Sequence, residues 1–224
     1  MTESLLAHAI RTEDAREAGT IGFMARVLVQ TTLPHSKPQS STFVRRNGRL
    51  QFSMTANPMV GLPFGRYPRL LMAWLTTEAV REKSPKIRLG DNLSQFMGAL
   101  GLSVTGGLSG TINRFRDQVK RLFSTTISVT HDLEAGHQWH DSGFRLATKT
   151  HLWWKPEQPS RIGIWHSHVV LSSEFFKAIT ERPVPIDMRV LRVLKSSLAL
   201  DTYTWLTYRS SYLEQPCRIS WQSL

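Results

Sequence analysis

A run of basic and polar side chains between Thr111 and Phe123 has the clearest potential for chemistry in this sequence. Arginine and lysine bond phosphate oxygens, arginine also bonds guanine, and asparagine or glutamine bonds adenine. Wound as a helix, the segment places its apolar residues on one narrow arc and its polar residues opposite, with Arg116 and Gln118 at the edges. The arc comprises Ile112, Phe115, Val119, Leu122 and Phe123. An ordinary solvated amphipathic helix has the same pattern, so the segment alone leaves both readings open.

If the outward face contacts DNA, its side chains divide into two expected roles. We predict that bases are read by Asn113, Arg114, Asp117 and Arg121. We predict that phosphates are held by Arg116, Gln118 and Lys120 of the same segment, and by Arg145 and Lys149 further along the chain. Phosphate contacts position a protein on the duplex, whereas base contacts make it specific.

A second set of residues would perform a different chemistry. His166 and His168, two residues apart on a predicted strand, point to one face and could ligate a divalent metal ion. A nicking enzyme would pair such a site with a nucleophilic tyrosine, and Tyr203, Tyr208 and Tyr212 lie on one predicted helix. The polar Ser167 between the histidines and the lack of a lysine near the tyrosines disfavour this enzyme reading. The glycine-rich residues 101–110 lack the lysine of a phosphate-binding P-loop, so we expect no enzymatic activity, metal or cofactor.

The elements that must position the basic segment follow a recognisable order. Helical patterns at Arg69–Lys83 and Asp91–Leu100 precede it, with Asp91 or Asn92 as a cap, and Lys86–Leu89 is a short strand between them. β-Branched and aromatic runs follow at Thr125–Val129 and Phe144–Trp154. Helix, turn and basic helix followed by a hairpin is the plan of a winged helix, an α+β fold. The sequence therefore predicts a winged helix whose wing is His131–Gly143.

The remaining segments suggest three regions. Residues 1–42 are expected to form an N-terminal extension and a polar linker, and the Asn47-Gly48 pair predicts a hairpin just after it. Residues 43–180 form the predicted winged helix. Because AWLT at Ala73–Thr76 recurs as TWLT at Thr204–Thr207, residues 181–224 are expected to be the incomplete start of a second winged helix.

Charge favours a nucleic-acid partner. The chain carries a net charge of +11, and residues 43–124 alone hold 13 basic and 4 acidic residues. A localised excess of this kind is typical of proteins that bind the phosphate backbone. Cys217 is the single cysteine, which excludes an intramolecular disulfide. No apolar run approaches the length of a membrane span and no signal sequence is present, so we expect a soluble, cytoplasmic protein without a membrane partner.

Four segments in this order resemble a known family. RYPRLLMAWLTTEAV, LGDNLSQFMGALGL, TGGLSGTINRFRDQVKRLF and LDTYTWLTYRSSYL are similar to the RepA replication initiators of Gram-negative plasmids. The resemblance implies double-stranded DNA at repeated origin sites as partner, contact with host replication proteins, and a switch between repressor dimers and origin-binding monomers. This chain ends where a second winged helix would continue, which predicts a truncated form, a regulatory fragment or a degenerate copy. The alternative function is a dimerisation module with little DNA affinity.

Overall fold

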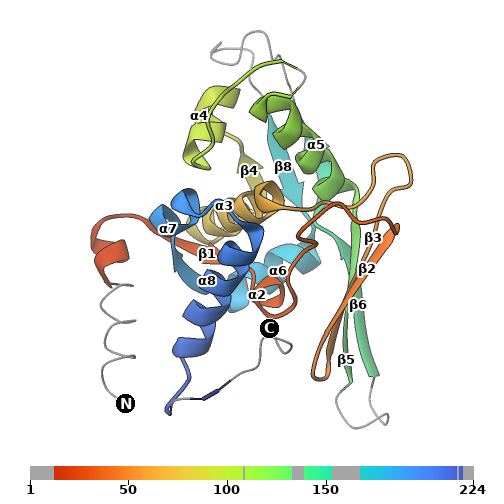
Figure 1. The fold of residues 1–224 in the computed structure, drawn as a ribbon, viewed down its shortest axis with the longest axis vertical. Helices are drawn as coiled ribbons and strands as arrows, with labels where there is room; N and C mark the ends of the chain where they lie inside the picture. Colours follow the sequence, from red (N-terminus) through yellow and green to blue (C-terminus); the bar gives the residue numbers. More distant parts are fainter. Residues whose placement is uncertain (1–12, 108, 133–138, 153–166, 216, 219–224) are drawn as a thin grey trace.

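The structure is a computed structural model that describes residues 13–107, 109–132, 139–152, 167–215 and 217–218 (Figure 1). Residues 13–17 are helical. The later helices are α2 (Arg26–Thr31), α3 (Arg66–Glu82), α4 (Leu93–Ala99), α5 (Thr111–Ser124), α6 (Ser173–Glu181), α7 (Met188–Val193) and α8 (Ser197–Ser210). The strands are β1 (Ile21–Met24), β2 (Thr42–Asn47), β3 (Leu50–Thr55), β4 (Lys86–Arg88), β5 (Thr126–Asp132), β6 (Trp139–Arg145), β7 (Ala147–His151), β8 (His168–Leu171) and β9 (Val184–Asp187).

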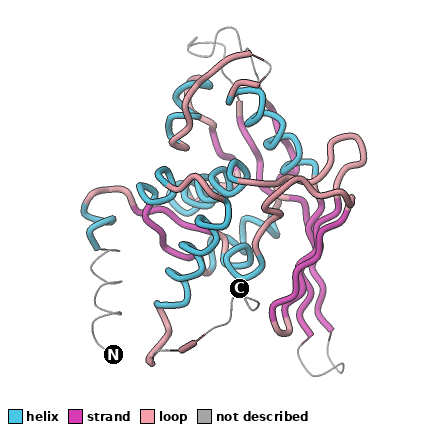
Figure 2. The backbone as a smooth tube through the Cα atoms, viewed as in Figure 1, coloured by secondary structure: helices cyan, strands magenta, loops and turns pink. Residues whose placement is uncertain are grey.

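The described residues form three antiparallel sheets, two of which contact the long helix α3. One has the order β4-β8-β7, a second has β2-β3-β5-β6, and a third consists of β1 and β9. The second sheet projects away from the helices as a long, narrow ribbon (Figure 2). Since β5 directly follows α5, this ribbon begins at the carboxyl end of the basic helix.

The predicted winged helix is confirmed. Its helices are α3, α4 and α5, and its first strand, β4, lies between α3 and α4. The β4 strand pairs with β8, with Ile87 opposite Val169, and β8 pairs in turn with β7. Asn92 caps α4 by accepting the backbone N–H of Gln95, as its position before the apolar repeat predicts.

The wing was predicted in the wrong place. The strand β4 pairs with β8, so the hairpin of this winged helix is β7–β8, and its connecting residues 153–166 lie outside the described part of the chain. The predicted wing at His131–Gly143 belongs instead to β5 and β6, which join β3 in the projecting ribbon. Alternating β-branched residues predict a strand but do not indicate which strand it pairs with. The predicted hairpin at Asn47-Gly48 is confirmed as β2–β3, and β5 pairs with β3 of this hairpin.

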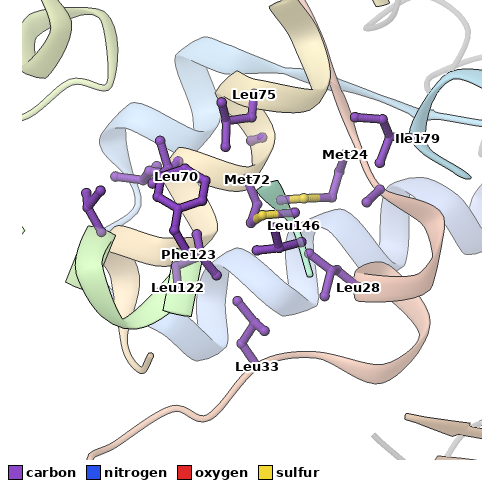
Figure 3. Close-up of a cluster of buried hydrophobic side chains, with 14 of the residues drawn as sticks. Met24, Leu28, Leu33, Leu70, Met72, Leu75, Leu122, Phe123, Leu146 and Ile179 are labelled. Carbon is purple, nitrogen blue, oxygen red and sulfur yellow. The ribbon is translucent and has the colours of Figure 1, made fainter. Parts of the chain in front are cut away.

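The hydrophobic core is centred on α3. Met72 and Leu75 are completely buried, and Figure 3 shows side chains from α2, α3, α5 and α6 converging on one cluster. Phe115 of α5 contacts Phe96 of α4 edge-on, with ring centroids 5.7 Å apart, and Phe96 contacts Trp74 of α3 at 5.0 Å. These aromatic contacts fix the position of α5 relative to the other two helices of the winged helix.

Contacts cross both predicted domain boundaries. β9 pairs with β1, with Ile21 opposite Asp187, and α8 packs against α2, α3 and β9. Leu200 and Thr204 of α8 are buried in these contacts. The division into residues 1–42, 43–180 and 181–224 stays a prediction, but the described residues of all three ranges contribute to a shared hydrophobic cluster.

Candidate nucleic-acid interface

The basic segment is one continuous helix, α5, with its apolar arc facing inward as predicted. All five residues of the predicted arc, Ile112, Phe115, Val119, Leu122 and Phe123, are buried. Tyr67 of α3 covers the outer side of Phe115, with the ring centroids 6.1 Å apart. Burial of this arc leaves the opposite side of α5 at the surface, where a nucleic acid can reach it.

The start of α5 is held by a tight loop. Thr105 and Thr111 exchange hydrogen bonds across it, and the Asn113 side chain donates to the carbonyl of Gly107 at 2.8 Å. A Cβ at Gly110 would lie 2.2 Å from the carbonyl oxygen of Gly106, so this close approach requires glycine. The loop fixes the orientation of α5, and it occupies one of the amide donors that Asn113 would offer to a base.

The exposed side of α5 presents a mixed set of charges. Arg114 and Lys120 are exposed, and Asn113, Arg116 and Asp117 are partly exposed. These five predicted contact residues therefore share an accessible surface. Asp117 binds Arg121 through a 2.7 Å ion pair, which reduces the repulsion between this carboxylate and an approaching phosphate.

Gln118 does not belong to this surface. It is buried, and its side-chain oxygen accepts the backbone N–H of Phe64 at 2.8 Å. Phe115, Gln118 and Leu122 follow a three-then-four spacing that places them on one face of a helix. This spacing indicates that Gln118 points inward. Its hydrogen-bond partner, the backbone N–H of Phe64, is distant in sequence and could not be predicted from the spacing. The predicted role of Gln118 as a phosphate contact has no support in this geometry.

Arg121 is also largely occupied by the protein. Its side chain is 17% exposed, and its guanidinium lies over the ring of Phe64 and within 3.4 Å of the carbonyl oxygen of Leu62. The predicted base-reading role of Arg121 would require it to leave these partners. Its observed contacts instead fasten the loop before α3 to the last turn of α5.

Arg145 and Lys149 lie in different sheets. Arg145 ends β6 and donates to the carbonyl of Phe123 at 2.9 Å, which places it beside the carboxyl end of α5. Lys149 is an exposed residue of β7 in the sheet of the winged helix. Both are accessible, but only Arg145 has a contact that connects it to α5.

Sequence reasoning missed two basic residues on the same sheet as Lys149. Lys86 and Arg88 are exposed on either side of the buried Ile87 in β4. Lys86 and Lys149 both pair with Val170 of β8, so the two lysines lie on one face of the sheet, two strands apart. The alternation of basic, apolar and basic residues in KIR is a signal for such a face. Lys86, Arg88 and Lys149 form a second cationic surface, here called the sheet cations.

The contacts of the described residues do not support the alternative reading of a metal-dependent nicking enzyme. His166 lies outside the described residues, and His168 stacks on His151 with ring centroids 5.6 Å apart. Among the described residues, no group of three or more His, Cys, Asp or Glu side chains is arranged to hold a metal ion. The hydroxyl of Tyr203 accepts the backbone N–H of Asp187 at 2.8 Å, which assigns that tyrosine a structural contact.

None of the helices in the described part of the chain is long and apolar enough to cross a membrane.

Comparison with known proteins identifies the family. The sequence profile described as plasmid encoded RepA protein matches residues 62–222. The chain belongs to this family. The resemblance seen in the sequence is thereby confirmed, and the family places the chain among proteins of the replication-initiator type. A search of curated proteins finds no significant match.

Two solved structures share the fold. A crystal structure of RctB domains 2–3 is 15% identical, covers 84% of this chain and 70% of that chain, and superposes with a TM-score of 0.58. A selenomethionine form of RctB domains 2 and 3 is 14% identical, covers 82% of this chain and 73% of that chain, and gives a TM-score of 0.56. At this low identity the likeness supports the fold.

Proposed function

We propose that this protein binds double-stranded DNA sequence-specifically, at repeated sites of a plasmid origin, to initiate replication or control copy number. The observation that carries the proposal is the exposed polar side of α5. This helix is the second one of a helix-turn-helix in a chain of the RepA family. In this fold that helix enters the major groove. Arg114 and Lys120 are the exposed cations on it, and they are well placed to contact base edges and phosphates.

The sheet cations extend the proposed interface. Lys86, Arg88 and Lys149 lie on the hairpin sheet of the winged helix, where positive charge would hold the backbone flanking the groove. We propose that these contacts supply affinity without sequence preference, whereas α5 supplies specificity. Such binding needs no metal or cofactor, and we propose that the protein acts without enzymatic chemistry of its own, through host replication proteins recruited at the origin.

The test is a gel-shift titration with the plasmid origin and with random duplex of equal length, at several salt concentrations. Tighter binding to the origin, with affinity that falls steeply as salt rises, is the expected result. Arg114→Ala should reduce the preference for the origin, and Lys177→Ala on α6, which removes a similarly exposed cation away from α5, serves as the matched control. Equal affinity of the wild type for both duplexes would contradict the proposal.

Self-association is the second candidate function. Four large apolar side chains at the carboxyl end of the described chain are exposed: Val193, Leu198, Leu206 and Tyr212. Exposed apolar residues grouped on neighbouring elements are typical of interfaces. We propose a homodimer through α7 and α8 as the alternative, which sedimentation of the wild type and of a Leu198→Ser, Leu206→Ser variant would test. A dimer without DNA affinity would favour this function over the first.

A further inference from the structure

The loop between β3 and α3 carries an apolar side chain that the fold does not use. Met59 is 93% exposed, the highest exposure of any large apolar residue in the described part of the chain. Single exposed apolar residues are common on protein surfaces. Met59 differs because the backbone that presents it is firmly held.

Three hydrogen bonds make the turn rigid. The side-chain oxygen of Asn57 accepts a hydrogen bond from the N–H of Met59 at 2.9 Å. The backbone carbonyl oxygen of Asn57 accepts hydrogen bonds from the N–H groups of Val60 and Gly61 at 3.0 and 2.9 Å. Pro58 further restricts the backbone between Asn57 and Met59. The turn therefore projects Met59 in a defined direction at little additional entropic cost when a partner binds.

This turn is attached to the carboxyl end of α5 from two sides. Before it, Thr55 pairs with Thr126, two residues after the end of α5. After it, Gly61 has a φ of +85°, a backbone conformation that favours glycine, and the guanidinium of Arg121 lies directly against this residue. The hydrogen bond from Phe64 to Gln118 continues the attachment one turn back along α5. Figure 1 shows the loop after β3 next to the same end of the helix.

We propose that Met59 is an apolar wedge that inserts between base pairs of duplex DNA from the minor groove adjoining the major groove that α5 occupies. The inference rests on the proposed function of α5. Apolar side chains such as methionine unstack a base step in this way and bend the duplex, and flexible pyrimidine–purine steps yield most readily. Arg145, attached to the carbonyl of Phe123 at the same end of α5, would hold a phosphate beside the bent step. The ligand is therefore duplex DNA with a deformable step next to the sequence read by α5.

The test begins with duplexes of about 30 base pairs selected from a random library by the full-length wild-type protein, a length that allows two to three helical turns. Bending is measured by circular-permutation electrophoresis, and unstacking by fluorescence of 2-aminopurine placed at successive steps. The variants are Met59→Ser, which removes the wedge, and Met59→Leu, which keeps an apolar side chain. Val44→Ser on β2 is the control, because Val44 is also exposed, at 56%, and has no proposed role in binding.

The wild type and Met59→Leu should bend the selected duplex and brighten 2-aminopurine at one step. Met59→Ser should melt at the wild-type temperature, lose the bend and the fluorescence change, and bind about tenfold more weakly, with the loss reduced on duplexes mismatched at that step. If Met59→Ser bends and unstacks DNA as the wild type does, the inference is overturned while the DNA-binding function stands, and the exposed methionine then serves another partner. If the wild type selects no sequence, both proposals are overturned.

Discussion

The carboxylate of Asp201 on α8 accepts two hydrogen bonds from Arg69 on α3, one from Nε and one from Nη2, each 2.7 Å long. The Arg69 side chain is only 3% exposed, and its remaining donors reach the carbonyl oxygens of Leu33, Pro34 and Gly65. One buried guanidinium thus joins α3, α8 and the segment that follows α2. Asp201 supplies the counter-charge and the carbonyl oxygens accept other N–H groups, so the guanidinium is paired although it lies inside the protein.

Removing the carboxylate should therefore be costly. Asp201→Ala leaves the buried Arg69 charge without its counter-ion and should lower the free energy of unfolding by about 3–5 kcal/mol. Lys177→Ala, which breaks the exposed ion pair with Glu181 on α6, is the control and should cost less than about 1 kcal/mol. Urea titration of both variants measures the difference, and equal small losses would show that the pair is not needed to hold α8.

The stability of the protein should fall in mild acid through His35. Burial, and then the positive charge of Arg69, lower the pKa of His35 below its ordinary value of 6.5, with Arg45 acting in the same direction and Asp201 against it. As the pH falls below 6.5 the unfolded chain takes up a proton at His35 before the folded chain does, so the folded state loses stability until its own lower pKa is passed. Above pH 6.5 this contribution is fully present.

Chemical denaturation between about pH 7.5 and 5.5 tests this dependence. His35→Asn removes the titrating ring, so the variant should lose less stability than the wild type over the same range. Ser197, within 3.2 Å of the His35 ring, contacts the ring without titrating in this range, and Ser197→Ala is the control that should keep the wild-type slope. Parallel curves for wild type and His35→Asn would assign the acid sensitivity to other groups.

Arg114 and Arg121 should respond differently to substitution, although both lie on α5. Arg114→Ala should weaken binding to a specific site by about 1–3 kcal/mol if it bonds guanine, with an unchanged melting temperature because the side chain is exposed. Arg121→Ala should lower the melting temperature because it removes the contacts to Asp117 and Leu62. Gel shifts and thermal melts on both variants separate the roles. A stable Arg121→Ala protein with lost specificity would restore the base-reading role predicted from the sequence.

The sheet cations should govern affinity rather than sequence preference. Lys86→Ala and Lys149→Ala should each weaken binding to origin and random duplex alike and lower the slope of log affinity against log salt by about 1. Lys177→Ala, an exposed lysine of α6, should leave the slope unchanged. A slope that is the same in all three variants would place the sheet outside the interface.

Phe115→Ala tests the packing of α5 itself. Phe115 is fully buried between Tyr67 and Phe96, so its truncation should cost about 3–5 kcal/mol. Phe43 on β2 is only partly buried, and Phe43→Ala should cost less. A Phe115→Ala protein that unfolds like the wild type would mean that the aromatic contacts between α4 and α5 contribute little.

Local sequence patterns predicted the helices of the winged helix well. The apolar arc of α5 has the regular spacing of a helix that is half buried, and its five members are all inside. The cap at Asn92 and the strand at Lys86–Arg88 depend on neighbouring residues alone, and both could be recognised before the structure.

Features that depend on distant partners could not be recognised in this way. The polar side chain of Gln118 predicts a phosphate contact at the surface, but the backbone N–H of Phe64 makes a buried glutamine favourable here. The predicted position of the wing is wrong because β4 pairs with β8, which comes later in the chain than β5 and β6. An arginine in a helix, such as Arg69, is ordinarily expected at the surface. Its ion-pair partner Asp201 is far away in the sequence, and the two residues meet only in the folded structure.

The pairing of β1 with β9 has a consequence for synthesis of the chain. Met24 at the end of β1 and Ile186 in β9 belong to the same core cluster as α3, yet they come from nearly opposite ends of the described sequence. A ribosome must therefore release almost all of this chain before the sheet can close over its helix, and non-local pairing of this kind is slow. The folded state should therefore form only after β9 has been synthesised, and a chain interrupted before Val184 would leave β1 without its partner strand.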